Sequence, residues 1–477
     1  MSDIFPWIVP ALLGAIFMLL AGTNACVLAA SLRVTKGWRG PSVVPLFGGA
    51  AGAIAFASAP NETLRSFAWL PLFLDVGCAP YLILVGFVSL KNALRSGNWK
   101  QHVPFLRYLH KMPPANREPY PKEKAIVGCL LGTAVGDAMG LACEGLTRRR
   151  QLRMYPQIES YRLLFNKGLT SDDTEHTCML AQSLIETGNY HPELLERKFC
   201  SNFGWRLRFW LLGLPAGIGL ATLRAILKLW IGFPARKSGV YSAGNGPAMR
   251  IALIGVCYGE DPQKMRTLVR AATRITHADP KAECGALAVA LAAHFAATRP
   301  SDVGPAEYLP ALEQSIGAES PEFMALIRSM TGSVERKEDS AQFAARIGCA
   351  EGISGYMYHT VPAALHVWLS HQSDYHSAVL SMIRLGGDTD TTAAIVGAIV
   401  GARVGKMGMP AEWLRDLREW PRTSGWIEQL GITLAARCAD GCVSGAVPVS
   451  IPRLLVRNVL FLVLVLLHGF RRLLPPY

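Results

Sequence analysis

The eleven cysteines of this 477-residue chain are scattered, odd in number and without the paired spacing of zinc ligands. The closest pair, Cys438 and Cys442, is a single C-x3-C, which is weak evidence for any site. This pattern predicts free, mostly buried thiols in a reducing compartment. The chain also contains no nucleic-acid-binding motif and few of the alternating patterns typical of strands. We therefore expect no nucleic-acid partner and an essentially helical protein.

Positive charge is concentrated at the two ends of the chain. Residues 1–124 carry 12 Lys and Arg against 5 Asp and Glu, and residues 437–477 carry 5 against 1. The central part, residues 125–436, is nearly neutral, with 31 against 29. The basic ends are also the most apolar parts, and basic charge beside apolar segments is typical of the cytoplasmic face of a membrane. The charge therefore predicts a lipid membrane as partner.

Three long apolar stretches open the sequence, at Ile4–Leu32, Val43–Ala59 and Phe67–Leu90. A helix that spans a bilayer needs about 20 residues, so they predict an N-terminal transmembrane helical region over residues 1–95 with about three helices. The first stretch lacks the basic start of a signal peptide, and two further stretches follow it. Buried helices of a soluble domain remain the alternative interpretation.

The charges of the loops predict how these helices are oriented. Basic residues lie between the first and second stretches and again after the third, whereas the Asn61–Ser66 loop carries one Glu and one Arg. The positive-inside rule then places the amino terminus outside and everything after about residue 91 in the cytoplasm. We expect a multi-pass protein of a bacterial-type inner membrane. Asp75, within the third stretch, could serve a function or simply face other helices.

The remainder of the chain divides into three further segments. Residues 96–124 form a basic, proline-containing linker, and residues 125–436 follow a helical pattern throughout. Within them, Trp205–Phe233 is apolar but interrupted by charges and proline, and we interpret it as buried helices of this domain. In the C-terminal extension, 437–477, an apolar core at Val459–Leu467 has arginines on both sides. Such a helix suits the membrane interface better than a crossing, although a fourth span remains an alternative.

Two short acidic clusters carry the chemistry, Thr170–Thr174 and Gly386–Thr391. Each holds two carboxylates and neighbouring hydroxyls directly before a predicted helix. Taken singly, each is explained as a helix cap, but one cap needs only one side chain. Together they form an all-oxygen set of the kind that suits Mg²⁺ or Mn²⁺. If they hold a metal in common, oxygens of the two clusters should lie within about 4–5 Å of one another.

Six segments in order resemble the motifs of the ADP-ribosylglycohydrolase family, over about residues 125–436. Each motif is weak alone, and their order makes the resemblance specific. The segments are Gly128–Gly145, Thr170–Thr174, Gly217–Thr222, Ser242–Arg250, Thr276–Pro280 and Leu385–Thr392.

The resemblance implies an all-α orthogonal helical bundle with a binuclear metal cleft that holds two Mg²⁺ or Mn²⁺ ions. The family usually has threonine where this chain has Ser171, and serine keeps the hydroxyl oxygen. The resemblance also implies a catalytic role for Asp173 and Glu144, although Glu144 could equally be a solvated loop acid. The implied metal ligands are Ser171, Asp172, Asp173, Asp388, Asp390 and Thr391.

The family pattern further implies a substrate-binding surface made of two glycine turns and a histidine. Backbone N–H groups of a glycine-rich turn before a helix can bind a diphosphate. Alone, this turn would be an ordinary helix start, and the histidine would be ordinary hydrogen-bonded structure. The implied residues are Gly217, Gly219, Ser242, Gly244, Asn245, Gly246 and His277.

The resulting expectation is a membrane-anchored, metal-dependent hydrolase that removes ADP-ribose from modified protein side chains, in particular from arginine. Its partner would be an ADP-ribosylated protein. One alternative is a module that binds ADP-ribose without cleaving it. Another is a membrane transporter or sensor with a degenerate hydrolase domain as its regulator.

Overall fold

The computed structural model describes residues 121–475 apart from 189–190, 317–318 and 441–444, together with scattered residues between 10 and 71. Contacts divide the chain into two units, one made of Met1–Arg107 with Lys228–Phe233 and one made of the rest. The predicted membrane-spanning stretches, Asp75 and most of the predicted linker lie outside the described residues, apart from those scattered positions. The second unit contains both acidic clusters and all six motif segments.

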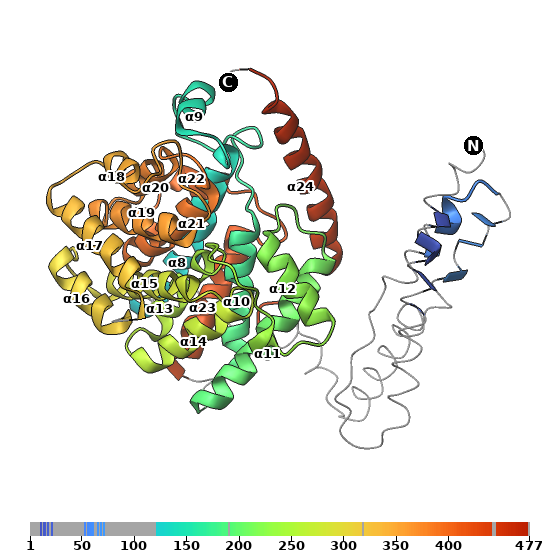
Figure 1. Cartoon of the computed structure of the whole chain (residues 1–477), viewed down its shortest axis with the longest axis horizontal. Coiled ribbons are helices and arrows are strands. Elements are labelled where there is room, and N and C mark those ends of the chain that lie inside the picture. The colour runs from blue at the N-terminus through green and yellow to red at the C-terminus, as the bar shows by residue number, and fades with distance from the viewer. Residues whose placement is uncertain are drawn as a thin grey trace. The chain divides into compact units, whose positions relative to one another are not determined.

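The described part of this unit is helical, and between residues 121 and 475 the described segments contain no strand, only isolated bridges. This result confirms the all-α prediction. Figure 1 shows the helices. They are α8 (Pro121–Gly140), α9 (Arg148–Met154), α10 (Asp172–Thr187), α11 (Pro192–Leu212), α12 (Leu220–Trp230), α13 (Ala248–Tyr258), α14 (Pro262–Arg274), α15 (Pro280–Thr298), α16 (Pro305–Ile316), α17 (Pro321–Glu335), α18 (Ser340–Arg346), α19 (Met357–Ser370), α20 (Tyr375–Ile383), α21 (Thr389–Val404), α22 (Ala411–Asp416), α23 (Ser424–Asp440) and α24 (Ile451–Arg471).

Helices α8 and α21 cross the middle of the domain in direct backbone contact. Glycines recur at every fourth position of α8, from Gly128 to Gly140, and all face α21. A Cβ atom added at Gly136 would lie 2.2 Å from the carbonyl oxygen of Ala393, and one at Gly140 would lie 2.2 Å from that of Thr389. Only glycine allows this approach. We call this contact the α8–α21 seam.

The other helices surround this pair. Helices α10 and α23 pack against α8, and α13 and α15 pack against α21. Helices α16, α17 and α18 lie on one side of the domain, and α24 lies on the opposite side (Figure 1). The core is therefore built around the seam, and α24 is an addition to the outside of the bundle.

Helices α11 and α12 correct one prediction. The segment from Trp205 to Leu227 forms helices of this domain, whereas Lys228–Phe233 falls in the other unit. These helices are not fully buried, because Phe209 is 61% exposed and Leu220 is 60% exposed. Phe203, Leu207 and Trp210 fill the inner side of α11, so Trp205 and Phe209, one turn apart, are left on the outer side. The apolar composition of α11 therefore covers two faces, of which one meets solvent.

Two helices among the described residues are long and apolar enough to cross a membrane, Lys122–Cys143 and Ile451–Arg471. The first is entirely buried and is the core helix α8 with its short extension. It begins at Pro121, within the predicted linker, because proline suits a first helical turn. The second is α24, which is longer than its apolar core Val459–Leu467 and largely exposed.

Candidate active site

Three buried carboxylates from three different helices meet in the middle of the domain. Asp137 of α8, Asp173 of α10 and Asp390 of α21 each place an oxygen within 4.8 Å of the others. The α8–α21 seam brings Asp137 beside Asp390, because Gly136 and Gly140 press this part of α8 onto the start of α21. The two acidic clusters of the sequence therefore meet, through Asp173 and Asp390.

The first cluster begins helix α10, and one of its side chains caps the helix, as the sequence predicts. Ser171 is the N-cap residue, and its side chain accepts a hydrogen bond from the Asp173 backbone N–H. Asp137 holds the same turn from the opposite side. Its carboxylate accepts hydrogen bonds from the backbone N–H groups of Ser171, at 2.9 and 3.0 Å, and Thr174, at 3.2 Å. The Asp173 carboxylate, in turn, accepts from the hydroxyls of Ser171 and Thr391, at 2.9 and 3.3 Å.

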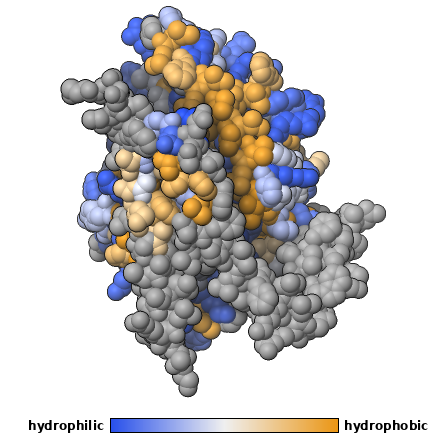
Figure 2. Space-filling view, turned by 90° about the vertical axis from the view of Figure 1, so that its right-hand side faces the viewer, coloured by the Kyte–Doolittle hydropathy of each residue, from blue (hydrophilic) through white to orange (hydrophobic). Residues whose placement is uncertain are grey.

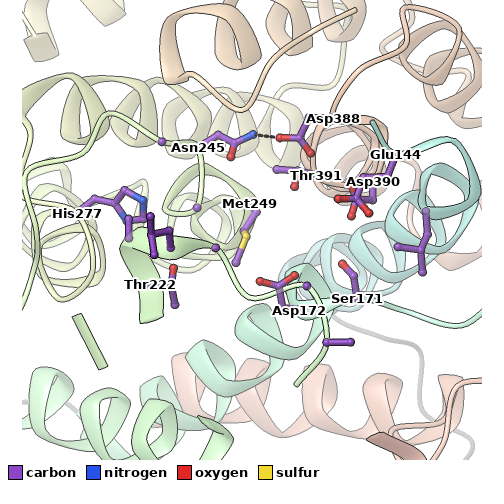
Figure 3. A pocket seen from close by; sticks show the side chains of 18 of the residues that line it. Glu144, Ser171, Asp172, Thr222, Asn245, Met249, His277, Asp388, Asp390 and Thr391 are labelled. Atoms are coloured by element: carbon purple, nitrogen blue, oxygen red, sulfur yellow. Dashed lines mark hydrogen bonds between the residues drawn. The ribbon is translucent and has the colours of Figure 1, made fainter. Parts of the chain in front are cut away.

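The second cluster stands at the start of helix α21, where Asp388 occupies the N-cap position without a side-chain capping bond. Backbone bonds fix this loop: Gly387 N–H donates to Leu146 O at 2.8 Å, and Asp388 N–H donates to Ile353 O at 2.8 Å. The Asn245 side-chain amide donates to the Asp388 carboxylate at 2.7 Å (Figure 3). Capping therefore does not account for the Asp388 side chain, which points into the cleft.

The electrostatics of the cluster favour a bound cation. Burial raises the pKa of Asp137 to about 7, and burial together with the neighbouring carboxylates raises the pKa values of Asp172, Asp173 and Asp390 well above the usual range. One oxygen each of Asp173 and Asp390 is buried without a hydrogen-bond partner. Buried acceptors without a partner are costly, and a divalent cation would both pair them and relieve the repulsion. This donor set, oxygen throughout, fits Mg²⁺ or Mn²⁺.

A cavity of about 430 Å³ opens beside the cluster. Asp173 lies behind its wall, and every other residue named from the sequence as a metal, catalytic or substrate residue lines it. These are Glu144, Ser171, Asp172, Gly217, Gly219, Ser242, Gly244, Asn245, Gly246, His277, Asp388, Asp390 and Thr391.

The cavity has two chemically different ends (Figure 3). Carboxylates from the loop after α8 and from the starts of α10 and α21 lie at one end and His277 lies toward the other, with Asn245 between them, bonded to Asp388. The structure therefore brings the predicted residues together around one cleft. Their individual roles remain predictions.

The glycine turn before α13 is shaped by His277. A Cβ atom at Gly244 or Gly246 would lie 3.1 or 3.0 Å from the His277 ring, so side chains there would displace the turn or the ring. Burial, with the nearby Arg250 charge, lowers the pKa of His277 to about 3, so the ring is neutral. Arg250 donates to Gly246 O at 2.8 Å and Thr276 Oγ1 at 2.7 Å. This arginine therefore ties the turn to the loop that carries the histidine.

Glu144 lies in the loop after α8, at the carboxylate end of the cleft. Its side chain is exposed at the cleft, and partial desolvation there, and secondly the charge of Asp388, raise the pKa of this carboxyl group. The Gly145 N–H donates to Gly387 O at 2.7 Å, so the loop is attached to the second cluster. A carboxyl group with a raised pKa beside reacting atoms suits proton transfer.

A network of buried charges connects the first cluster to α24. Arg457 of α24 donates to Thr170 O at 2.6 Å and to the Glu419 carboxylate at 2.8 Å. Glu419 also accepts from the Thr170 N–H at 3.0 Å. Glu175 of α10 pairs with Arg422 and accepts from Trp210 Nε1. These contacts hold the residue that directly precedes Ser171.

Reasoning from the sequence missed three features of this site. Asp137 and Arg250 stand inside segments recognised as motifs, GDAMG and GNGPAMR, and a single charged residue within each apolar, glycine-rich segment was the available signal. Phe461 and Val465 of α24 also line the cleft. Nothing in the sequence placed the C-terminal extension there, because that contact depends on how the finished domain packs.

Comparisons with a family model and with known proteins agree on one family of hydrolases. The family model for ADP-ribosylglycohydrolase matches residues 118–444. The ADP-ribosylhydrolase ARH3 of Xenopus tropicalis is 26% identical over a region that covers 64% of this chain and 93% of its own. The ADP-ribosyl-[dinitrogen reductase] glycohydrolase of Rhodospirillum rubrum is 26% identical over 61% of this chain and 89% of its own. The ADP-ribosylarginine hydrolase Tri1 of Serratia proteamaculans is 27% identical over 64% of this chain and 78% of its own.

Proposed function

Because the chain belongs to the ADP-ribosylglycohydrolase family, we propose that it is a membrane-anchored, metal-dependent hydrolase that releases ADP-ribose from modified arginine side chains of proteins. The observation that carries the proposal is the meeting of Asp137, Asp173 and Asp390 beside a cleft lined by two glycine turns. A cation-binding end and a phosphate-binding end in one cavity suit a ligand with a ribose and a diphosphate.

The residues of the cleft suggest how the substrate is held. The turn Gly244–Gly246, before α13, lines the cavity. The Asn245 N–H donates to Gly355 O at 2.9 Å, so the N–H of Gly246, and that of Gly244 if it leaves Ser242 Oγ, are the donors for a diphosphate. The neutral His277 ring adds a hydrogen-bonding nitrogen without a charge. The distal ribose would then lie at the carboxylate end, near Asp388 and Asp390.

The scissile bond joins C1″ of that ribose to a side-chain nitrogen, and its cleavage passes through an oxocarbenium-like state. Bound Mg²⁺ would supply Lewis acidity, binding ribose hydroxyls and lowering the pKa of a water molecule. Ser171, Asp172, Asp173, Asp388, Asp390 and Thr391 would hold the ions.

We assign the proton transfers to Glu144, whose raised pKa suits a donor to the departing nitrogen, and which, once deprotonated, can accept the proton of the attacking water. Asp173 lies behind the cavity wall, so its unpartnered oxygen would hold a cation rather than meet that water.

Two finer parts of the proposal have separate support. The arginine linkage is supported by the similarity to a relative whose name states that substrate, the Serratia hydrolase. Membrane anchoring is supported by the apolar stretches before residue 95 and by the basic ends of the chain. The same charges support a multi-pass protein with its catalytic domain in the cytoplasm.

The test is release of ADP-ribose from arginine-linked, serine-linked and DNA-linked substrates by the full chain in detergent, with Mg²⁺ or with a chelator. We expect Mg²⁺-dependent release from the arginine-linked substrate, lost in Asp388→Ala. Full activity of that variant would sink the metal assignment. Tight binding of ADP-ribose without release from any substrate would identify a binding module instead.

A further inference from the structure

Helix α24 presents two opposite faces with different chemistry. Arg457, Asn458 and Phe461 are buried against the domain, and Asn458 Nδ2 donates to Gly213 O at 2.7 Å. At the far end His468 lies 3.0 Å from Ala142 O. The spacing of these contacts, at three to four residues, defines one helix face, so the remaining faces point away from the bundle.

The outward face is almost entirely apolar. Nine consecutive residues, 459–467, carry no polar side chain, and Leu460, Leu467 and Phe470 are 62%, 61% and 65% exposed. Figure 2 shows hydrophobic residues gathered on this side of the molecule. Twenty-one helical residues extend about 30 Å, so the exposed strip is far larger than the isolated apolar side chains common on protein surfaces.

A tight turn beside α24 adds an exposed aromatic ring. Phe165 and Asn166 both have φ in the left-handed region, at 41° and 61°, and Phe165 is 93% exposed. Left-handed backbone costs a non-glycine residue roughly 1–2 kcal/mol. An exposed phenylalanine side chain makes no packing contacts that would offset this cost. Such strain at an exposed side chain points to a binding role.

An apolar groove joins this turn to α24. It has a volume of about 370 Å³ and is lined by Leu164 and Trp420 on one side and by Leu460, Val463 and Leu467 on the other. This apolar lining suits a hydrocarbon chain. We call the outward face of α24, this groove and Phe165 the docking face.

Charge indicates what the docking face binds. The described C-terminal residues from Gly445 to Pro475 include no acid, and the whole chain after Asp440 has none. The exposed Arg453 precedes the apolar strip and the exposed Arg471 follows it, whereas Arg472 turns inward and donates to Ala142 O at 3.2 Å. An apolar strip with cationic ends and aromatic neighbours matches the interface of an anionic bilayer, with acyl chains against the strip and headgroups against the arginines.

We propose that the docking face binds the surface of an anionic lipid bilayer and that α24 is thereby both a membrane-bound helix and a wall of the catalytic cleft. Phe461 and Val465, on the inner side of the same helix, line the cleft. Arg457 ties the helix to Thr170, next to the first acidic cluster. Lipid bound on one side of α24 therefore holds the cleft wall on the other. This coupling rests on the proposed hydrolase function, whereas the lipid contact does not.

The test is site-specific photo-crosslinking in the full chain, reconstituted into vesicles of phosphatidylcholine with phosphatidylglycerol. A benzophenone side chain replaces Phe165 or Leu460, and the control position is Ala325, exposed on α17 across the domain. Burying one large apolar side chain favours lipid about tenfold or more. We expect at least about tenfold more lipid adduct at residues 165 and 460 than at residue 325, and less when phosphatidylglycerol is omitted.

A double variant, Leu460→Glu with Val463→Glu, keeps the test decisive. Both side chains are at least half exposed, so the melting temperature in detergent should stay close to that of the unchanged protein. The lipid adduct at residue 165 should fall about tenfold, because two carboxylates then face anionic headgroups. Adducts to another protein, to a second copy or to residues 1–120 of the same chain would overturn the proposal, as would equal lipid adducts at all three positions. Crosslinking needs no turnover, so the result is independent of hydrolase activity.

Discussion

Replacing Asp390 with asparagine separates two effects of the carboxylate cluster: the charge repulsion that destabilises the fold and the binding of a metal ion. The Asp390 carboxylate has one buried oxygen without a partner, and Asp137 and Asp173 each place an oxygen within 4.8 Å of it. At an effective dielectric constant near 20, two unit charges at that distance repel by about 3.5 kcal/mol. Proton uptake relieves part of this, as the raised pKa values show, so we expect a net gain of about 1–2 kcal/mol from Asp390→Asn without metal.

That gain has a measurable counterpart in the melting temperature of the full chain in detergent with a chelator. With an unfolding entropy of about 2.1 cal/mol/K per residue over roughly 310 residues, one kcal/mol corresponds to about 1.5 °C, so Asp390→Asn should melt about 1.5–3 °C above the unchanged protein. With Mg²⁺ at about 100 times its dissociation constant, the unchanged protein should gain about 2.7 kcal/mol, and the variant should gain little. Hydrolysis should be lost.

Two other variants serve as controls. Asp137→Ala removes the same charge and also both acceptor oxygens for Ser171 and Thr174, each bond being worth about 1.5–3 kcal/mol to a charged acceptor, so it should melt lower. Asp302→Asn, on an exposed loop, should change the melting temperature little. If Asp390→Asn melts below the unchanged protein without metal, or keeps its Mg²⁺ response, the reasoning is refuted.

The same carboxylates predict a pH dependence of the metal-free protein. Their folded pKa values lie above those of the unfolded chain, so the folded state binds more protons. The stability of the metal-free protein should therefore fall as pH rises from about 4 through about 7, the folded value for Asp137. Thermal melts in chelator at about pH 5, 6, 7 and 8 check the sign. Mg²⁺ should restore stability at the high end, and a rise in stability with pH in chelator would contradict the prediction.

Three further variants probe the surrounding structure. Gly136→Ala places a Cβ atom 2.2 Å from a carbonyl oxygen of α21, so it should lower the free energy of unfolding in denaturant by at least about 1–3 kcal/mol. The control Gly425→Ala has open space around it and should lower this free energy much less. Arg457→Met leaves Glu419 buried without its cation and should cost about 3–5 kcal/mol, partly recovered by adding Glu419→Gln, and thermal melts of both check this. Asn245→Ala removes a 2.7 Å bond to a carboxylate and should lower kcat/KM about 10–100-fold in the release assay, with Asn245→Asp no better.

How much the sequence could predict depends on whether the cause is local. The start of α10 follows from its capping residue Ser171, and both clusters were visible because their acids and hydroxyls are adjacent in the sequence. Asp137 was not, because its nearness to Asp390 arises only when α8 and α21 come into contact. The exposed side of α11 was missed because composition alone does not say which of two apolar faces meets the core.

The sequence pattern did carry one long-range signal, the repeat of glycine at every fourth position of α8. It marks a helix face that accepts another backbone, but it does not name the partner helix. The match between Gly128 and Gly401 and between Gly132 and Gly397 needs the antiparallel alignment seen in the structure. Physical chemistry thus predicts the local elements well, and their pairing depends on the sum of many contacts across the domain.

The α8–α21 seam also limits the radius of the ion that the carboxylate cluster can hold. Sites built only from flexible side chains adjust to larger ions by rotating those side chains. Here two main chains touch beneath Asp137 and Asp390, so the width between these residues cannot shrink and widens only if the helices separate. Mg²⁺–oxygen distances are about 2.1 Å and Ca²⁺–oxygen distances about 2.3–2.6 Å, a difference smaller than one methyl group. On the proposed metal assignment, the glycines of the seam would therefore set which cation fits, and a methyl group added at one of them would widen the site.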